Sequence, residues 1–238
     1  DLDVAKNGGG ASSGGGSLGE DEDYFFQRPS VTYMPGSGRA LFGGGYTDDF
    51  YGKIQMSHIP TLGNTSDFGD LIYARQMQGG ISNVTRGIFI NGSAPSSATA
   101  LDSIEMQSLG NGADFGDLAT YRRGNTGFSN SIRGLISGGY DGSNRIVNID
   151  YLTIATAGDT TDFGDMTVAV SDRGCFCSST RGIMAGGQGS TVDVIEYITV
   201  ASTGDASDFG DLTVARWLGH SNGNSGTRGI MAGGHNGS

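Results

Sequence analysis

The feature that most constrains this chain is an internal repeat of about 47 residues. An arginine followed by an apolar run recurs at Arg39, Arg86, Arg133, Arg181 and Arg228, and a glycine follows it in every copy except the first, where Ala40 stands. The intervals are 47, 47, 48 and 47 residues, the first being 86 − 39 = 47. An Asp-Phe-Gly-Asp element recurs at a similar spacing, with intervals of 47, 48 and 46 residues, and begins at Asp67, Asp114, Asp162 and Asp208. Because such a period is typical of solenoids, propellers and arrays, we expect four complete units and a fifth that stops after its Gly-Gly.

Each unit is predicted to contain three or four short strands and almost no helix. The Arg-Gly element opens a continuous apolar run such as Ile183–Ala185, which suits a strand buried on both faces. After Gly-Gly comes an alternating segment such as Val194–Val200, rich in β-branched and aromatic residues. A further strand, as in Ala215–Leu218, would close the unit. No stretch shows a sustained helical period with caps, so the sequence predicts an all-β fold.

The residues that recur are interpreted as structural. The phenylalanines of the Asp-Phe-Gly-Asp elements are expected to be equivalent buried anchors: Phe68, Phe115, Phe163 and Phe209. An Arg and an Asp that recur in step are explained if each guanidinium binds a carboxylate between strands. We therefore expect Arg86, Arg133 and Arg181 each to contact an Asp of such an element. Stacking of the arginine on an aromatic ring is the alternative.

Residues 1–30 are predicted to be a Gly-rich N-terminal anchor or linker, and residues 31–238 the repeats. The sequence GGGASSGGGSLGE is typical of a linker. We expect Tyr24–Gln27 to pair beside Arg228–Gly233 and close the fifth unit, because an unpaired strand edge invites aggregation. Asp1–Gly19 would then extend to another subunit. A longer chain with further units, or closure by a partner chain, are the alternatives.

A hydrophobic strand, Gly-Gly, a polar link, a strand with Tyr and then an aromatic residue is the order of the kelch motif, which residues 31–238 resemble. The glycine pairs that fit are Gly43-Gly44, Gly138-Gly139, Gly186-Gly187 and Gly233-Gly234. Asn91-Gly92 departs from the motif, as does the Phe of Asp-Phe-Gly-Asp, which replaces a late Trp. TVASTGDASDFGDLTVAR followed by TRGIMAGG is similar more specifically to kelch-like repeat proteins of tailed phages, notably marine cyanophages. The resemblance implies a β-propeller of about five four-stranded blades, the fifth completed from the chain ends.

The same resemblance implies a non-enzymatic virion structural or appendage protein of the tail-fibre or capsid-decorating type, located in the extracellular particle. Its N-terminal segment would bind other virion proteins in a symmetric assembly, and its variable loops would attach to host-surface glycans. The main alternative is a secreted bacterial carbohydrate-binding or carbohydrate-active propeller. An intracellular adaptor of the eukaryotic kelch type is disfavoured by the low Lys content.

No catalytic, cofactor-binding or metal-binding residues are expected. The net charge of −11 argues against nucleic acid as a partner, and no apolar run approaches the roughly 18 residues that span a membrane. Asp-Phe-Gly is a kinase motif only beside partners that this chain lacks. The acidic loops, such as Asp205–Asp211, offer oxygen ligands for Ca²⁺, but turns and ion pairs are the favoured interpretation.

The remaining candidate ligands are few. His220 and His235 lie in one unit, but nothing in the other units supports a copper site of the galactose oxidase type, so both are interpreted as loop residues. Cys175 and Cys177 would lie on one face of a strand. Without a nearby His they form half a zinc site at best, and they are interpreted as small, semi-buried residues of one variant unit.

Overall fold

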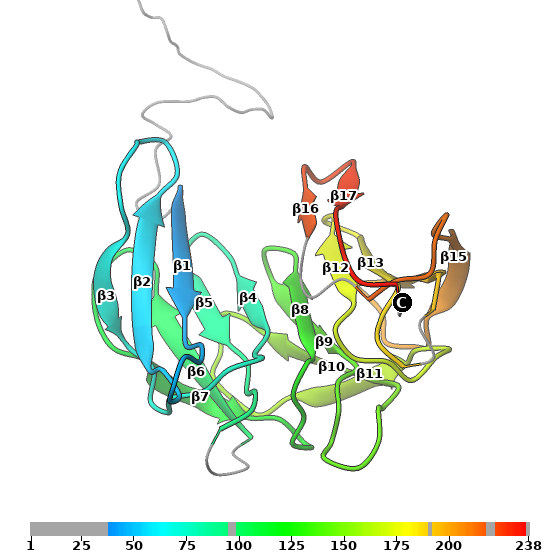
Figure 1. Cartoon of the computed structure of the whole chain (residues 1–238), viewed down its shortest axis with the longest axis horizontal. Coiled ribbons are helices and arrows are strands. Elements are labelled where there is room, and N and C mark those ends of the chain that lie inside the picture. Colours follow the sequence, from blue (N-terminus) through cyan, green and yellow to red (C-terminus); the bar gives the residue numbers. More distant parts are fainter. Residues whose placement is uncertain (1–37, 95–98, 190–191, 218–221, 237–238) are drawn as a thin grey trace, which may run out of the picture. The chain divides into compact units, whose positions relative to one another are not determined.

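The computed structural model describes residues 38–94, 99–189, 192–217 and 222–236 (Figure 1). The chain divides into two compact units, Asp1–Arg39 and Ala40–Ser238. Apart from Gly38 and Arg39, the described residues belong to the second. Every helix or strand among them is a β-strand. The predicted all-β fold is therefore confirmed.

The strands form five sheets that follow one another along the chain. Sheet I contains β1 (Arg39–Gly43), β2 (Lys53–His58) and β3 (Ser66–Asp70). Sheet II contains β4 (Gly80–Ser82), β5 (Arg86–Phe89), β6 (Ala100–Glu105) and β7 (Ala113–Asp117). Sheet III contains β8 (Thr126–Ser129), β9 (Arg133–Ser137), β10 (Asn148–Thr153) and β11 (Thr161–Asp165). Sheet IV contains β12 (Gly174–Cys177), β13 (Arg181–Ala185), β14 (Val194–Thr199) and β15 (Ser207–Asp211). Sheet V contains β16 (Asn222–Asn224) and β17 (Gly229–Met231).

Strand order in sheets II to IV follows chain order, and neighbouring strands are antiparallel. The Arg-Gly elements form the second strand of these three sheets, as the apolar run predicts. Leu135 and Ile136 of β9 point to opposite faces, and both are fully buried. The first strands β4, β8, β12 and β16 contact one another in succession, so consecutive sheets are packed side by side.

Two strand assignments differ from the sequence prediction. The Asp-Phe-Gly-Asp elements were expected in acidic loops, but they form the edge strands β3, β7, β11 and β15. Ala215–Leu218 was expected to be a strand, but Trp217 makes only an isolated bridge to His235, and Leu218 lies outside the described residues. The strand after each acidic element begins later and belongs to the following sheet, because it pairs with the next Arg-Gly strand.

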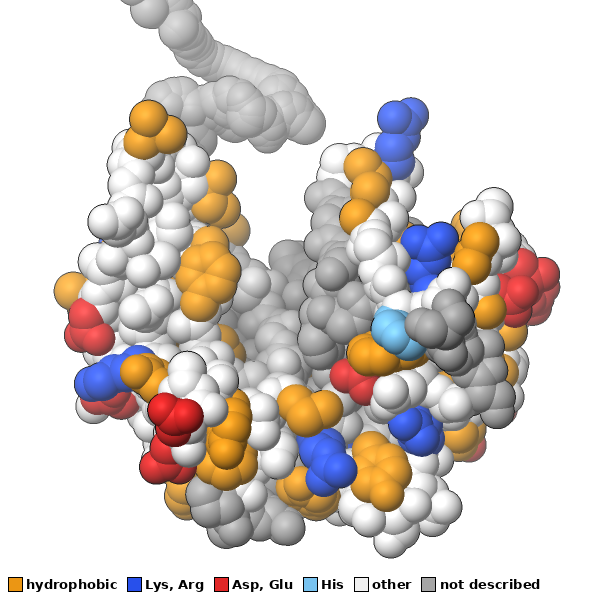
Figure 2. Space-filling view, in the orientation of Figure 1, with side chains coloured by type: hydrophobic (Ala, Val, Ile, Leu, Met, Phe, Trp, Pro, Cys, Tyr) orange, Lys and Arg blue, Asp and Glu red, His pale blue; other side chains and the backbone are white. Residues whose placement is uncertain are grey.

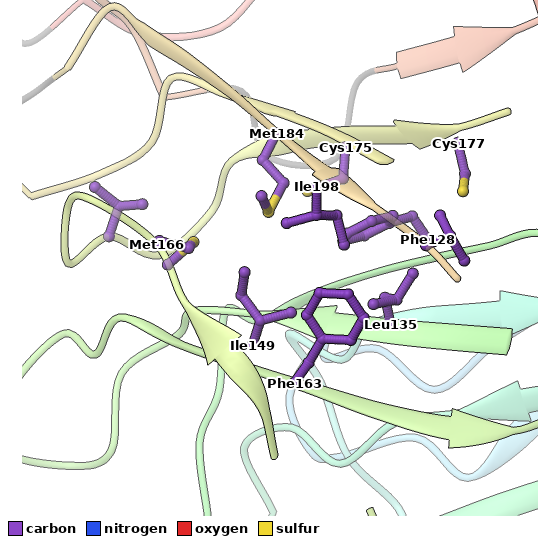
Figure 3. Close-up of a cluster of buried hydrophobic side chains, with 11 residues drawn as sticks. Phe128, Leu135, Ile149, Phe163, Met166, Cys175, Cys177, Met184 and Ile198 are labelled. Atoms are coloured by element: carbon purple, nitrogen blue, oxygen red, sulfur yellow. The ribbon is translucent and has the colours of Figure 1, made fainter. Parts of the chain in front are cut away.

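The hydrophobic core lies between consecutive sheets. In Figure 3, Leu135, Ile149 and Phe163 of sheet III point toward a second group of side chains from sheet IV. That second group consists of Cys175, Met184 and Ile198. Equivalent clusters contain Phe115, between sheets II and III, and Phe68, between sheets I and II. Each sheet therefore buries its apolar face only by packing against its neighbour.

The anchor prediction holds for three of the four phenylalanines. Phe68, Phe115 and Phe163 are each 2% exposed, whereas Phe209 is 53% exposed. Phe209 lies on the last four-stranded sheet, and sheet V has only two strands among the described residues. The prediction for Phe209 is therefore wrong, because sheet V has no third strand among the described residues to cover its ring.

Backbone hydrogen bonds also join the edge strands β3, β7 and β11 to the next sheet. The amide of Gly204 donates to the Phe163 carbonyl at 2.7 Å, and the amide of Ala206 donates to the Asp165 carbonyl at 2.8 Å. Gly164 has φ of 143°, and a Cβ there would lie 2.5 Å from the Gly204 carbonyl group. Only glycine allows two backbone segments to approach this closely. The same bonds join β3 to Gly110 and β7 to Gly158.

Cys175 and Cys177 are buried free cysteines in the core between sheets III and IV. The Sγ atom of Cys175 lies 3.4 Å from the Ser137 hydroxyl. Burial raises the pKa of each thiol to about 11. They are thus more deeply buried than the semi-buried positions that the sequence predicts.

The predicted closing strand Tyr24–Gln27 and the segment Asp1–Gly19 lie outside the described residues, as does the boundary at residue 30. Among the described strands, β17 pairs only with β16. No helix within the described ranges is long and apolar enough to cross a membrane.

Candidate functional site

Three arginines of the Arg-Gly elements, Arg86, Arg133 and Arg181, lie over aromatic rings. The guanidinium carbon lies 4.4 Å from the Tyr151 ring centroid for Arg133 and 4.6 Å from the Tyr197 centroid for Arg181. Arg86 lies 5.8 Å from the Phe115 centroid. None of these three arginines forms an ion pair with a described carboxylate. The predicted contact with the Asp-Phe-Gly-Asp elements is therefore wrong, and the stacking alternative is what the structure shows.

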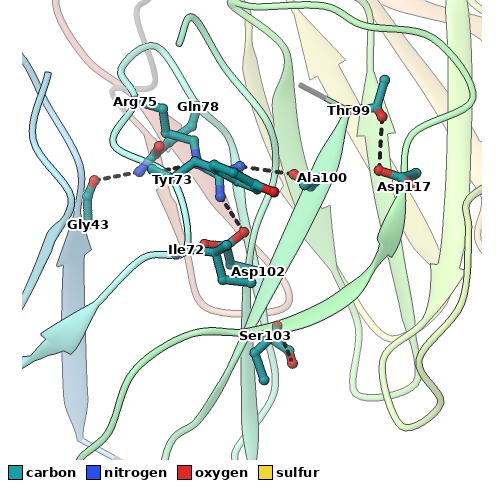
Figure 4. Close-up of polar contacts among 11 residues, drawn as sticks. Gly43, Ile72, Tyr73, Arg75, Gln78, Thr99, Ala100, Asp102, Ser103 and Asp117 are labelled. Atoms are coloured by element: carbon teal, nitrogen blue, oxygen red, sulfur yellow. Dashed lines mark hydrogen bonds and ion pairs between the residues drawn. The ribbon is translucent and has the colours of Figure 1, made fainter. Parts of the chain in front are cut away.

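The carboxylates of those elements face solvent. Their first aspartates are all exposed: Asp67, Asp114, Asp162 and Asp208. The second aspartates make local contacts. Asp70 lies 3.0 Å from the Lys53 amine, and Asp117 accepts a hydrogen bond from the Thr99 hydroxyl at 2.9 Å (Figure 4). Nowhere in the described ranges do three His, Cys, Asp or Glu side chains gather in a way that could hold a metal ion. His235 stacks on Trp217 at 5.2 Å between ring centroids, and His220 lies outside the described residues.

A different set of arginines forms ion pairs between sheets. Arg75 pairs with Asp102, and its Nη1 donates to the Ala100 carbonyl at 2.9 Å (Figure 4). The Arg122–Asp150 pair has a distance of 2.5 Å and the Arg173–Glu196 pair one of 3.4 Å. All six side chains are buried. Each pair connects the loop after one sheet to the third strand of the next, which makes it a structural clamp.

Sequence reasoning missed these pairs because the third pair breaks the repeat. Arg75 and Arg122 lie eight residues after the first Asp of their elements, where Val170 stands in the third unit. Arg173, three positions later, supplies the guanidinium instead, and its partner is Glu196 rather than an aspartate. The extra methylene of glutamate accompanies the displaced arginine. Burial raises the pKa of Asp150 and lowers that of Arg122, and each partner opposes the shift of the other.

Loops at the Gly-Gly turns bring neighbouring sheets together at the surface. After each turn, one residue forms an isolated β-bridge. In sheets II to V the partner of this residue comes from the preceding sheet, where it directly follows the position that corresponds to Arg75. The pairs are Gln76–Ser93, Arg123–Tyr140, Ser171–Gln188 and Trp217–His235, and in sheet I Tyr46 bridges to Phe50. Gly138 shows why the turn needs glycine, since its φ is 57° and a Cβ would collide with the Val170 carbonyl. We call the turns and loops that contain these bridged pairs the bridge loops.

The bridge loops combine a repeated backbone with changing side chains. The position after the glycines is Tyr46, Ser93, Tyr140, Gln188 or His235. These residues are at least partly exposed, in contrast to the buried clamps beneath them. Loops held by a rigid scaffold are where binding residues concentrate, and aromatic rings with polar tips suit a surface that is half apolar and half wet.

The best connected part of the bridge loops surrounds Tyr140. The guanidinium carbons of Arg123 and Arg145 lie 4.9 Å and 5.8 Å from its ring centroid. Arg145 also donates to the Gln188 side-chain oxygen at 2.6 Å and to the Ser171 hydroxyl at 3.2 Å. Arg145 therefore joins two neighbouring bridge pairs into one patch. Figure 2 shows basic side chains lying directly beside hydrophobic ones on the surface of the molecule.

A row of left-handed residues borders the patch. Met77, Gly124 and Asp172 have φ of 57°, 65° and 54°, and each immediately follows a bridge residue. The amide of Gly124 donates to the Met77 carbonyl at 3.0 Å, and the amide of Asp172 donates to the Gly124 carbonyl at 2.8 Å. Met77 and Asp172 adopt a conformation that is unfavourable for residues other than glycine and that clusters at functional sites. The bridge loops are therefore the best candidate site.

No protein-family model matches the chain, and no curated protein matches it. The candidate site is thus supported by its geometry alone. In that geometry, aromatic rings, guanidinium groups and amide groups lie on a fixed backbone, and such groups are typical of binding surfaces.

Proposed function

We propose that the chain is a non-enzymatic binding protein of the tailed-phage appendage type, whose bridge loops contact host-surface glycans. The single observation that carries the binding function is the contrast within the bridge loops between a repeated backbone and variable side chains that are at least partly exposed. A purely structural repeat has no need to vary Tyr140, Gln188 and His235 on one fixed turn. Placement on a virus particle is supported by the resemblance of the repeat to phage proteins.

The fold that we propose for this module is a kelch-like β-propeller of about five blades. Its support is the four-stranded order of sheets II to IV and the contacts of successive first strands, an arrangement typical of radial repetition. Closure would come from Tyr24–Gln27 pairing beside Arg228–Gly233. Phe25→Cys combined with Ile230→Cys should then form a disulfide under mild oxidation. Failure of this pair to crosslink in folded protein would leave closure to a partner chain or to further repeats.

A glycan array tests the binding function. We expect the purified chain to bind a subset of cell-surface glycans, and Tyr140→Ala to weaken that binding at least about tenfold, which equals about 1.4 kcal/mol. Val84→Ala is the matched control, because Val84 is exposed in a loop without a bridge pair. Binding that is insensitive to Tyr140→Ala, or no binding to any glycan, would contradict the proposal.

Immunogold labelling of purified virus particles tests the location separately. We expect antibodies against the chain to label particle surfaces at a fixed position. Recovery of the chain only as free protein in culture fluid would instead favour a secreted carbohydrate-binding module. The two experiments are independent, since a secreted module would still bind glycans.

A further inference from the structure

We propose that the patch around Tyr140 binds the carboxylate groups of an acidic polysaccharide through Arg123 and Arg145. This inference rests on the proposed glycan-binding function and names its ligand class. The chain has a net charge of −11, yet the two guanidinium groups beside Tyr140 have no carboxylate of the described residues within ion-pair distance.

Other arginines near the same loops are buried and form ion pairs. Arg75, Arg122 and Arg173 are buried, and each is neutralised by an acidic side chain of the next sheet. Arg123 directly follows Arg122 but points to the surface bridge, where it stacks on Tyr140. Among described residues its guanidinium donates no hydrogen bond, and Arg145 uses only Nε and Nη2. Donors therefore remain free on both side chains.

The arrangement of these donors fits a carboxylate. A guanidinium presents N–H groups in a fixed fork that matches the two oxygens of a carboxylate. Stacking on Tyr140 and the bond from Arg145 to Gln188 hold the two cations in place. Such preorganisation reduces the entropy cost of binding. The half-buried Tyr140 and Gln188 beside them offer a ring edge and an amide for sugar hydroxyls.

Two acidic residues are neighbours of the patch, Asp141 directly after Tyr140 and Asp172 directly after Ser171. Asp141 accepts hydrogen bonds from the Ser143 and Asn144 amides at 2.7 Å each, so its carboxylate is occupied within its own turn. The Asp172 carboxylate lies next to Gly124, close to where a Cβ of that residue would stand. Unlike Asp141, it accepts no hydrogen bond from the backbone of its own turn within the described ranges. Asp172 should therefore oppose an anionic ligand.

The experiment compares polygalacturonate with its fully methyl-esterified form, since the two polymers share a backbone and differ in charge. We expect the wild-type chain to bind the acid polymer at least about tenfold more tightly, and the difference to shrink as salt rises from about 0.05 to about 0.5 M, because exposed charges are screened. Arg123→Gln and Arg145→Gln should each weaken binding of the acid polymer about tenfold. Arg228→Gln is the matched control, because it removes the same charge from an exposed residue outside the bridge loops.

Asp172→Asn supplies a test of opposite sign. It should strengthen binding of the acid polymer severalfold, and asparagine tolerates the left-handed backbone about as well as aspartate. Equal affinity for both polymers, an equal loss in Arg228→Gln, or no gain in Asp172→Asn would overturn the proposal. Binding of neutral glycans through Tyr140 without binding of polygalacturonate would overturn it too, while leaving the proposed function intact. Circular dichroism of each variant checks that the fold is retained.

Discussion

The junction between sheets II and III and the junction between sheets IV and V use the same repeat residues with different results. In the first, Arg122 is buried against Asp150, and Phe115 is 2% exposed. In the second, the equivalent Arg216 donates to the Gly233 carbonyl at 2.9 Å at the surface, and Phe209 is 53% exposed. The residues are alike, but sheet V has no described third strand to supply a carboxylate or to cover the ring. Whether a residue of the repeat is buried and paired therefore depends on the sheet that packs against it.

The largest difference between the junctions should come from the buried ion pairs. Arg122→Met leaves Asp150 buried without its partner and should lower the free energy of unfolding by about 3 to 5 kcal/mol. Arg216→Met removes a partly exposed guanidinium and should cost less than about 1 kcal/mol. Urea denaturation of both variants measures the difference. Similar losses would mean that the two junctions are equally complete in solution.

Nearly as large a difference is expected for the phenylalanines. Phe163→Ala deletes a ring from the core between sheets III and IV and should cost about 3 to 5 kcal/mol. Phe209→Ala should stay within about 0.5 kcal/mol of the wild type. Thermal and urea unfolding of the two variants give the comparison. A large loss for Phe209→Ala would show that a further segment covers this ring.

A smaller difference is expected for the glycines of the edge strands. Gly164→Ala and Gly210→Ala place a Cβ on similar backbones, with φ of 143° and 139°. Only the first Cβ would meet the next sheet, at Gly204, whereas no described atom lies within 4 Å of the second. Overpacking of this kind costs about 1 to 3 kcal/mol, so Gly164→Ala should be less stable by that amount. Equal stability would refute the close approach of β11 to the next sheet.

The smallest difference is expected for the stacked arginines. Arg133 stacks on Tyr151 and also donates to the Val200 carbonyl of the next sheet at 2.6 Å. Arg181 stacks on Tyr197 in the same way, but no bond to a described residue of sheet V accompanies it. Arg133→Met should therefore cost about 1 to 2 kcal/mol and Arg181→Met about 0.5 to 1 kcal/mol. Indistinguishable unfolding midpoints would show that the bond to Val200 contributes nothing.

The period of the sequence predicted the strands better than it predicted their partners. The apolar Arg-Gly strands and the buried Phe163 can be derived from repetition, because burial of a central strand is a local pattern. The clamps cannot, since each joins residues of two different units and the third pair shifts its arginine to position 173. The exposure of Phe209 depends on whether a complete neighbouring sheet packs against it, and a pattern within one unit does not contain that information.

The candidate site could not be predicted from the repeat, because its residues differ from one unit to the next. Repeat analysis selects positions that stay constant, whereas the bridge loops vary at Tyr140, Gln188 and His235. Their common feature is a backbone bridge, and that becomes visible only when the turn of one sheet is placed beside the loop of another. The signal that could have identified them is the variable residue directly after each of the glycine pairs Gly138-Gly139, Gly186-Gly187 and Gly233-Gly234.

The two buried thiols make the junction between sheets III and IV observable by chemistry. A thiol with a pKa of about 11 is almost entirely protonated at neutral pH, and the thiolate is the reactive form. Alkylating reagents should therefore label Cys175 and Cys177 only when sheet IV separates from sheet III. The labelling rate would time the opening of that junction without any introduced probe, and comparison of this rate with the rate of global unfolding would distinguish local separation from complete unfolding.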